Sequence, residues 1–224
     1  IASSSAVREV RWLRASSVSR FWAFSVKFKG TDALTVCAGA FNRAVDVVLG
    51  LALRAYAFDA HKTDEKTNAE AALIYCAQPD ELQAEGATAM AVAEGVFFTR
   101  DLINEPANVL TTQEFADRLA AMTSIGLEVE VLDEPALEKL GMRTLLSVGE
   151  GSESPSKVVV MRWNGGADEK PLALVGKGVV FDTGGISLKP AGGMEDMTMD
   201  MGGAGVVSGV MRTLALRKAK ANVV

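Results

Sequence analysis

Residues 175–205 of this 224-residue chain read VGKGVVFDTGGISLKPAGGMEDMTMDMGGAG, and this stretch decides the fold. It begins within an apolar run rich in β-branched residues, 172–181, which is typical of a buried strand. Four charged residues then stand among glycines: Lys177, Asp182, Lys189 and Asp200. Because α/β folds keep their sites in loops at the ends of strands, we expect these side chains to line a site there.

The charged residues of this stretch suit a metal or a reacting group. A lysine in an apolar strand is costly to bury as a cation, so Lys177 could act as a neutral amine ligand or as a base. Asp182 precedes glycines that let the backbone turn sharply and leave the carboxylate facing an open site. Asp200 directly precedes a predicted helix, and its carboxylate could face the same site as that of Asp182.

A structural explanation exists for each residue taken alone. Lys177 would then be an edge lysine with its ammonium in water, Asp182 a turn former and Asp200 a helix N-cap. A glycine-rich loop with a lysine also suggests a phosphate site. The pattern GxxxxGK[ST] is absent, however, because the lysine is followed by a further glycine.

Outside this stretch, hydrophobic periodicity predicts alternating helices and strands. Helices are expected over residues 44–56, 81–103, 112–122, 134–140 and 202–218, and strands over 71–77, 127–132, 157–163 and 172–181. The last two strands, joined by Asn164-Gly165-Gly166, should form a hairpin, and TTQE at 111–114 should be a capping box. Such alternation is typical of the α/β class.

The composition fits an ordinary globular protein. The chain has 23 basic and 28 acidic residues, a net charge of −5, which disfavours a nucleic-acid binder that works by bulk charge. Its longest apolar stretches are broken by acidic residues and are shorter than the ~18 residues that a membrane span needs. Cys37 and Cys76 have neither CxxC nor zinc-site spacing. We therefore expect no membrane or nucleic-acid partner and a reducing compartment.

Both ends of the chain look cut. It starts with Ile1 rather than Met, and its last residues read as the opening of a strand straight after a helix. The first 28 residues are basic and serine-rich, which is also the composition of an organelle leader. A basic surface region of a truncated domain is the simpler interpretation.

Taken together, the motifs closely resemble those of the cytosol leucyl aminopeptidase family, the hexameric dimetal peptidases. VGKG, FDTGG, a lysine at 189 and DMGGA stand in the family's order. The resemblance extends back through NEPANVLTT at 104–112 and GMRTLLSVGEG at 141–151, and weakly to 47–63. It implies part of a catalytic domain with a mixed sheet and flanking helices, preceded by a shortened amino-terminal α/β domain.

The resemblance implies a role for each residue of the site. Lys177, Asp182 and Asp200 match metal ligands for two divalent ions, Zn²⁺ or Mn²⁺, with Asp182 bridging them. Lys189 matches the catalytic lysine that polarises the scissile carbonyl, and Met197 a wall of the pocket for the substrate's first side chain. The implied activity is release of leucine and other apolar residues from peptides with a free amino terminus, by water that the ions activate.

In the family, a later segment, NTDAEGR, supplies further acidic ligands and an arginine that holds a bicarbonate acting as proton shuttle. This chain ends before it, so we expect it to hold only part of the active site and to be inactive as given. Two aspartates bring −2 against the +4 of two divalent ions, which agrees with an incomplete ligand set. The alternative is a non-catalytic assembly or regulatory subunit that keeps the peptidase fold, and nucleotide binding is a third hypothesis.

The resemblance also predicts the organisation of the protein. It divides the chain into a partial amino-terminal α/β domain (1–80, with 1–40 unassigned), a connecting helix (81–103) and the first part of the metallopeptidase catalytic domain (104–224). A homohexamer is implied for the full-length protein, in the cytoplasm, or in an organelle if the basic stretch is a leader. Five apolar residues of the closing helix should be exposed in this chain: Val206, Val207, Val210, Met211 and Leu214.

Overall fold

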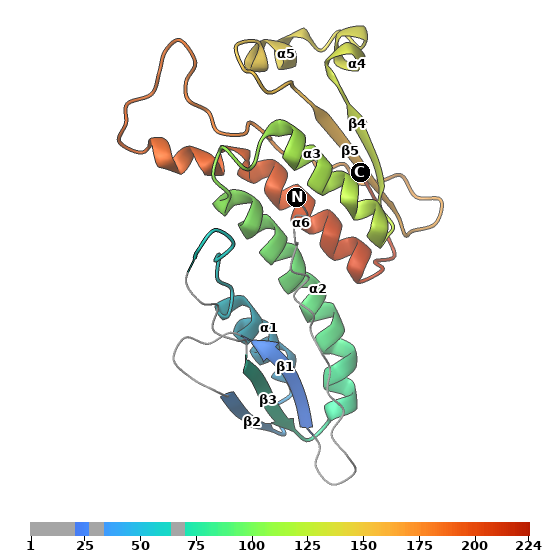
Figure 1. Ribbon diagram of the computed structural model, residues 1–224. Helices are drawn as coiled ribbons and strands as arrows, with labels where there is room; N and C mark the ends of the chain where they lie inside the picture. Colours follow the sequence, from blue (N-terminus) through green and yellow to red (C-terminus); the bar gives the residue numbers. More distant parts are fainter. Residues whose placement is uncertain (1–20, 27–33, 64–69) are drawn as a thin grey trace. The chain divides into compact units, whose positions relative to one another are not determined.

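Figure 1 shows the computed structural model, which describes residues 21–26, 34–63 and 70–224. The chain divides into two compact units, residues 1–93 and 94–224. The long helix α2 (Pro79–Asn104) contributes residues to both, and it confirms the helix predicted over 81–103. No helix in the described parts of the chain is both long enough and apolar enough to span a bilayer.

The described part of the first unit contains a three-stranded sheet. β1 (Phe21–Val26) pairs antiparallel with the central strand β3 (Glu70–Cys76), and β2 (Leu34–Gly39) pairs with β3 in parallel. Parallel strands need a crossover, and α1 (Ala44–Arg54) lies between β2 and β3 in the chain. Its buried residues follow at i, i+4 and i+8 on one helical face: Ala44, Val48 and Ala52. The helix predicted over 44–56 and the strand over 71–77 are therefore confirmed.

The second unit is built on an antiparallel sheet of three strands. β4 (Glu128–Leu132) pairs with β5 (Val158–Asn164), which pairs in turn with β6 (Asn222–Val223). The strands predicted over 127–132 and 157–163 are confirmed. The strand predicted to begin at the end of the chain is confirmed as well, because β6 pairs with β5 at the edge of the sheet.

Helices of the second unit begin and end mostly where the sequence predicts. Thr111 is the N-cap of α3 (Thr112–Ala120), because its side-chain oxygen accepts a hydrogen bond from the Glu114 amide at 3.2 Å. A 3-10 helix, η1 (Ala121–Ile125), follows α3. α4 (Glu134–Lys139) and α6 (Gly202–Leu216) are also confirmed. α5 (Arg143–Gly149) was not predicted. It buries no residue, so it lacks the apolar periodicity by which a helix is recognised in a sequence.

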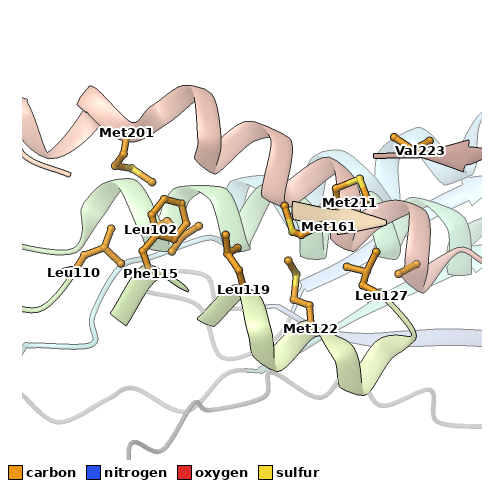
Figure 2. Close-up of a cluster of buried hydrophobic side chains, with 11 residues drawn as sticks. Leu102, Leu110, Phe115, Leu119, Met122, Leu127, Met161, Met201, Met211 and Val223 are labelled. Atoms are coloured by element: carbon orange, nitrogen blue, oxygen red, sulfur yellow. The ribbon is translucent and has the colours of Figure 1, made fainter. Parts of the chain in front are cut away.

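One hydrophobic core joins these helices to the sheet (Figure 2). Its buried members come from α2, α3, β5 and α6, among other elements: Leu102, Leu110, Phe115, Leu119, Met122, Leu127, Met161, Met201, Met211, Ala215 and Val223. Met201 has no exposed surface and lies beside Leu102 and Phe115 in Figure 2. The core therefore fixes the start of α6, which immediately follows Met201.

α2 and α6 approach each other closely at two glycines. A methyl group at Gly209 of α6 would lie 2.5 Å from the main-chain oxygen of Gly95 of α2, and one at Gly95 would collide with the main chain of Gly209 in the same way. Thr99 strengthens the contact, because its hydroxyl donates to the main-chain oxygen of Gly205 at 3.0 Å. Glycine is a weak helix former, yet α2 continues through Gly95, where the missing side chain leaves room for α6.

The hairpin predicted between residues 157–163 and 172–181 is wrong. β5 pairs with β4 and β6 instead, and only the start of the second run joins a strand: the Leu172 amide donates to Asn222 O at 3.0 Å, and the Leu174 amide to Val224 O at 2.7 Å. From Val175, which is 95% exposed, the chain leaves the sheet. The sequence pattern could not distinguish a parallel contact of three residues from a full strand.

The apolar face expected on α6 is only partly exposed. Val206 and Val210 are 54% and 39% exposed, whereas Val207 and Leu214 are half-buried. The prediction for Met211 is wrong, because its side chain is fully buried in the core of the unit.

Candidate metal and catalytic site

The loop that follows Phe181 holds Asp182 and Lys189 together. The ammonium of Lys189 lies 2.9 Å from Oδ2 of Asp182 and donates to the main-chain oxygen of the same residue, also at 2.9 Å. The Lys189 amide donates to Thr183 O at 2.9 Å, which closes the loop. Two residues seven positions apart in the sequence thus meet through both main chain and side chain.

Unusual backbone angles turn the chain around Asp182. Phe181 has φ of 61°, a value that a bulky residue rarely adopts, and Gly184 and Gly185 have φ of 92° and 64°. The Gly184 amide can therefore donate to Oδ1 of Asp182 at 2.8 Å. The sharp turn expected at these glycines is confirmed.

Lys177 and Asp200 form a second pair. The Lys177 ammonium donates to Oδ1 of Asp200 at 2.6 Å, although the two residues are 23 positions apart. The expectation that Lys177 is buried in a strand is wrong, because its side chain is 57% exposed where the chain has left the sheet. Asp200 is not the N-cap of α6 either: that position is Met201, and no side chain caps the helix.

A 3-10 helix, η2 (Met194–Met201), connects the two pairs. In such a helix, residues three apart share a face, so Met197 and Asp200 lie along the same edge. The Lys189 ammonium donates to the sulfur of Met197 at 3.2 Å, and Lys177 binds Asp200 on the next turn. The structure therefore brings Lys177 to Asp200, and Lys189 to both Asp182 and Met197, with Met197 and Asp200 on the same short helix.

Electrostatics favour an ionised carboxylate at Asp182. The hydrogen bond from Lys189 is the largest cause that lowers the pKa of Asp182 below its usual value, and the Gly184 amide is the next. The charge of Lys177 is the smallest of the causes that lower this pKa.

The donor atoms of the site fit part of a divalent-metal site. Oδ2 of Asp200 is buried and makes no hydrogen bond within the part of the chain that the structure describes. A buried carboxylate oxygen without a partner is costly, and a cation would satisfy it. Among residues 21–26, 34–63 and 70–224, no three His, Cys, Asp or Glu side chains form a metal cluster. In such a site, Asp182 and Asp200 would supply carboxylate ligands, and further ligands would be needed.

A buried ion pair stabilises the NEPAN segment that precedes α3. Glu105, only 6% exposed, accepts from Arg118 of α3 at 3.0 Å, and Arg118 also donates to Glu114 at 2.8 Å. Burial lowers the pKa of Arg118, but the hydrogen bonds to both glutamates outweigh this and raise it overall. The network ties the end of α2 to α3, both of which contribute to the core around Met201.

Two residues of the site region were missed in the sequence. Gly176 and Gly203 bring the main chain around Lys177 against the start of α6. The glycines flanking Lys177 and the pair after Asp200 were the signal, but only the spatial contact shows which of them matter.

Most of the second unit matches a known protein family. Residues 97–224 match the catalytic domain of the cytosol aminopeptidase family, Peptidase M17. A probable cytosol aminopeptidase of Dinoroseobacter shibae is 64% identical over 198 residues, which are 88% of this chain and 41% of that protein. One of Agrobacterium fabrum is 47% identical over 227 residues, 95% of this chain and 44% of that protein. The chain thus spans about two fifths of the length of these curated relatives.

Two solved structures are similar as well. The bottromycin maturation enzyme BotP in complex with Mn is 35% identical, with a TM-score of 0.70 over 81% of this chain and 38% of that one. Leucine aminopeptidase of Caenorhabditis elegans is 29% identical, with a TM-score of 0.69 over 82% of this chain and 37% of that one. Since the family match covers more than half of the sequence and includes every residue of the site, this chain belongs to the cytosol aminopeptidase family.

Proposed function

We propose that this chain supplies the first part of a dimetal aminopeptidase site. Lys177, Asp182 and Asp200 would hold two divalent ions, Zn²⁺ or Mn²⁺, whose Lewis acidity makes water a nucleophile at neutral pH. The single observation that carries the proposal is the pairing of Lys177 with Asp200 and of Lys189 with Asp182, with one carboxylate oxygen of Asp200 buried and unpartnered among the described residues.

Lys189 has the environment of a group that stabilises an oxyanion. Its three N–H bonds are directed to the carboxylate and the main-chain oxygen of Asp182 and to the sulfur of Met197. A thioether is the weakest of these acceptors, so a substrate carbonyl could replace it at the lowest cost. Lys189 would then donate to the oxygen on which charge develops, while Asp182 keeps the ammonium in place.

Met197 is half-buried at the edge of the site and would form a wall for the first side chain of the substrate. Leucine and other apolar residues suit such a wall, and a free amino terminus would make the substrate a peptide to be shortened from that end. We further propose a homohexamer at full length. A location in the cytoplasm is proposed as well, because the curated relatives are named probable cytosol aminopeptidases.

Metal content and turnover separate the proposed roles. Expressed from its complete reading frame, the protein should hydrolyse a leucine anilide in the presence of Mn²⁺. Asp182→Ala should lose both metal and activity. Lys189→Ala should keep its metal and lower turnover by ~10²–10³, the scale for losing one oxyanion donor. Equal metal loss in both variants would show that the assignment of metal binding to Asp182 and of oxyanion stabilisation to Lys189 is wrong.

The second candidate function is a non-catalytic assembly or regulatory subunit with the peptidase fold. The observation that favours it is that the described residues form no group of three or more His, Cys, Asp or Glu side chains able to hold a metal. A reading frame that stops at Val224, together with no metal-dependent hydrolysis, would support this alternative and overturn the proposed enzyme.

A further inference from the structure

The main chain beside Lys177 lies against the start of α6 at a contact that only glycine allows. A methyl group at Gly176 would lie 2.5 Å from the main-chain oxygen of Gly203 and 2.6 Å from the amide nitrogen of Ala204. Both neighbours are main-chain atoms of the helix, so neither can rotate away as a side chain would. An alanine at 176 must therefore push the segment away from α6.

A hydrogen bond fixes the same contact. The Ala204 amide belongs to the first turn of α6, where N–H groups have no partner within the helix, and it donates to Lys177 O at 2.8 Å. From the other side, a methyl group at Gly203 would lie 3.0 Å from the Lys177 nitrogen. Gly178 differs, because its methyl group would meet only the Cβ of Ala204 at 3.4 Å, an ordinary contact.

This contact sets the position of Lys177 relative to Asp200. Asp200 lies on the last turn of η2, which leads directly into α6, and its neighbour Met201 is fully buried in the core. The core thus holds Asp200. Lys177 lies in an irregular segment whose half-buried Leu174 and Val180 pack against the core on either side of it, while its own side chain is 57% exposed. Between these two residues the glycine contact fixes the main chain at Lys177, whose ammonium lies 2.6 Å from the Asp200 carboxylate.

We propose that Gly176 and Gly203 are positioning residues for the Lys177–Asp200 pair and act on it through the main chain. The inference rests on the proposed function only in taking this pair as part of the metal site. The proposal predicts that three substitutions increase the distance between Lys177 and Asp200 to different extents. Gly176→Ala should increase it most and Gly203→Ala less, whereas the matched control Gly178→Ala should hardly change it.

Two measurements on the protein expressed from its complete reading frame test the series. The first is acetylation of Lys177 under limiting acetic anhydride, measured by mass spectrometry relative to the exposed Lys170. The anhydride reacts with the free amine, so a Lys177 side chain that is no longer bound to the Asp200 carboxylate should react faster. The second is the Kd for Mn²⁺ alone, measured from the electron paramagnetic resonance signal of the free ion. We expect Gly176→Ala to raise Lys177 acetylation several-fold and to weaken Mn²⁺ binding about tenfold or more, a loss of about 1.4 kcal/mol. Gly178→Ala should change neither by more than about twofold.

The outcomes distinguish the positioning role from the proposed function. Faster acetylation in Gly176→Ala, with no Mn²⁺ binding even by the unmodified chain, would support the positioning role and contradict the metal site. Equal behaviour of Gly176→Ala and Gly178→Ala would overturn the positioning role. A lower free energy of unfolding with unchanged acetylation and Kd would also overturn it, since the glycines would then serve folding alone. If Gly176→Ala does not fold, the milder Gly203→Ala decides between the same outcomes.

Discussion

Gly209→Ala tests whether α2 and α6 cross at their glycines. In the interior of an exposed helix, replacing glycine by alanine stabilises a protein by roughly 0.5–1 kcal/mol. Here the new methyl group would lie 2.5 Å from Gly95 O, about 0.9 Å short of an ordinary contact at 3.4 Å, and the helices would have to separate. Overpacking of this kind costs about 1–3 kcal/mol. We therefore expect a net loss of about 1–2 kcal/mol in the free energy of unfolding.

Urea unfolding followed by far-UV circular dichroism measures this loss. Gly50→Ala is the matched control, because Gly50 lies inside α1 and a methyl group there would have nothing within 4 Å. This variant should gain stability. The double variant Gly95→Ala/Gly209→Ala should lose less than the sum of the single losses, since helices already separated by one methyl group accommodate the second. If Gly209→Ala gained stability as the control does, the close crossing of α2 and α6 would be refuted.

Three further changes have expected outcomes. Met201→Ala should cost about 2–5 kcal/mol in urea unfolding, because the side chain is fully buried, whereas Met199→Ala, at a side chain that is 55% exposed, should cost under about 0.5 kcal/mol. Arg118→Ala should cost about 1–3 kcal/mol by the same measurement, because it takes a partner from the buried carboxylate of Glu105; no loss would show that the ion pair is unimportant. Asp182 has a lowered pKa, so its pairing stabilises the fold above the unfolded pKa near ~3.9 and is lost as the pH falls through the lower folded value. Asp182→Asn should lack this part of the acid dependence, and identical acid unfolding curves for the two proteins would contradict the pairing.

Regular elements with a strong local signal could be predicted from the sequence. α3 has a capping threonine and an apolar face, and α2 is long and rich in strong helix formers such as alanine, so local rules suffice for both. α5 buries no residue, and the segment after Val175 leaves the sheet although its composition favours a strand. Local propensity fails there because long-range pairing with the end of the chain decides which residues join the sheet.

The site residues could be chosen from the sequence, but their partners could not. Lys177 and Lys189 stood out because lysines are rare among glycines at the end of an apolar run. Spacing did not show that Lys177 pairs with Asp200 and Lys189 with Asp182. Those pairings depend on the turn at Phe181 and on the contact of Gly176 with α6, and both are properties of the folded backbone.

The two lysine–aspartate pairs also bear on the order of events when the protein is made. Carboxylates gathered without countercharges repel one another, and a protein built that way needs its ion before it can close. Here each carboxylate has an ammonium beside it, so the four side chains carry no net charge. Under the proposed function, the newly made chain would therefore need no ion to complete its fold, and the ions would bind to the folded protein afterwards.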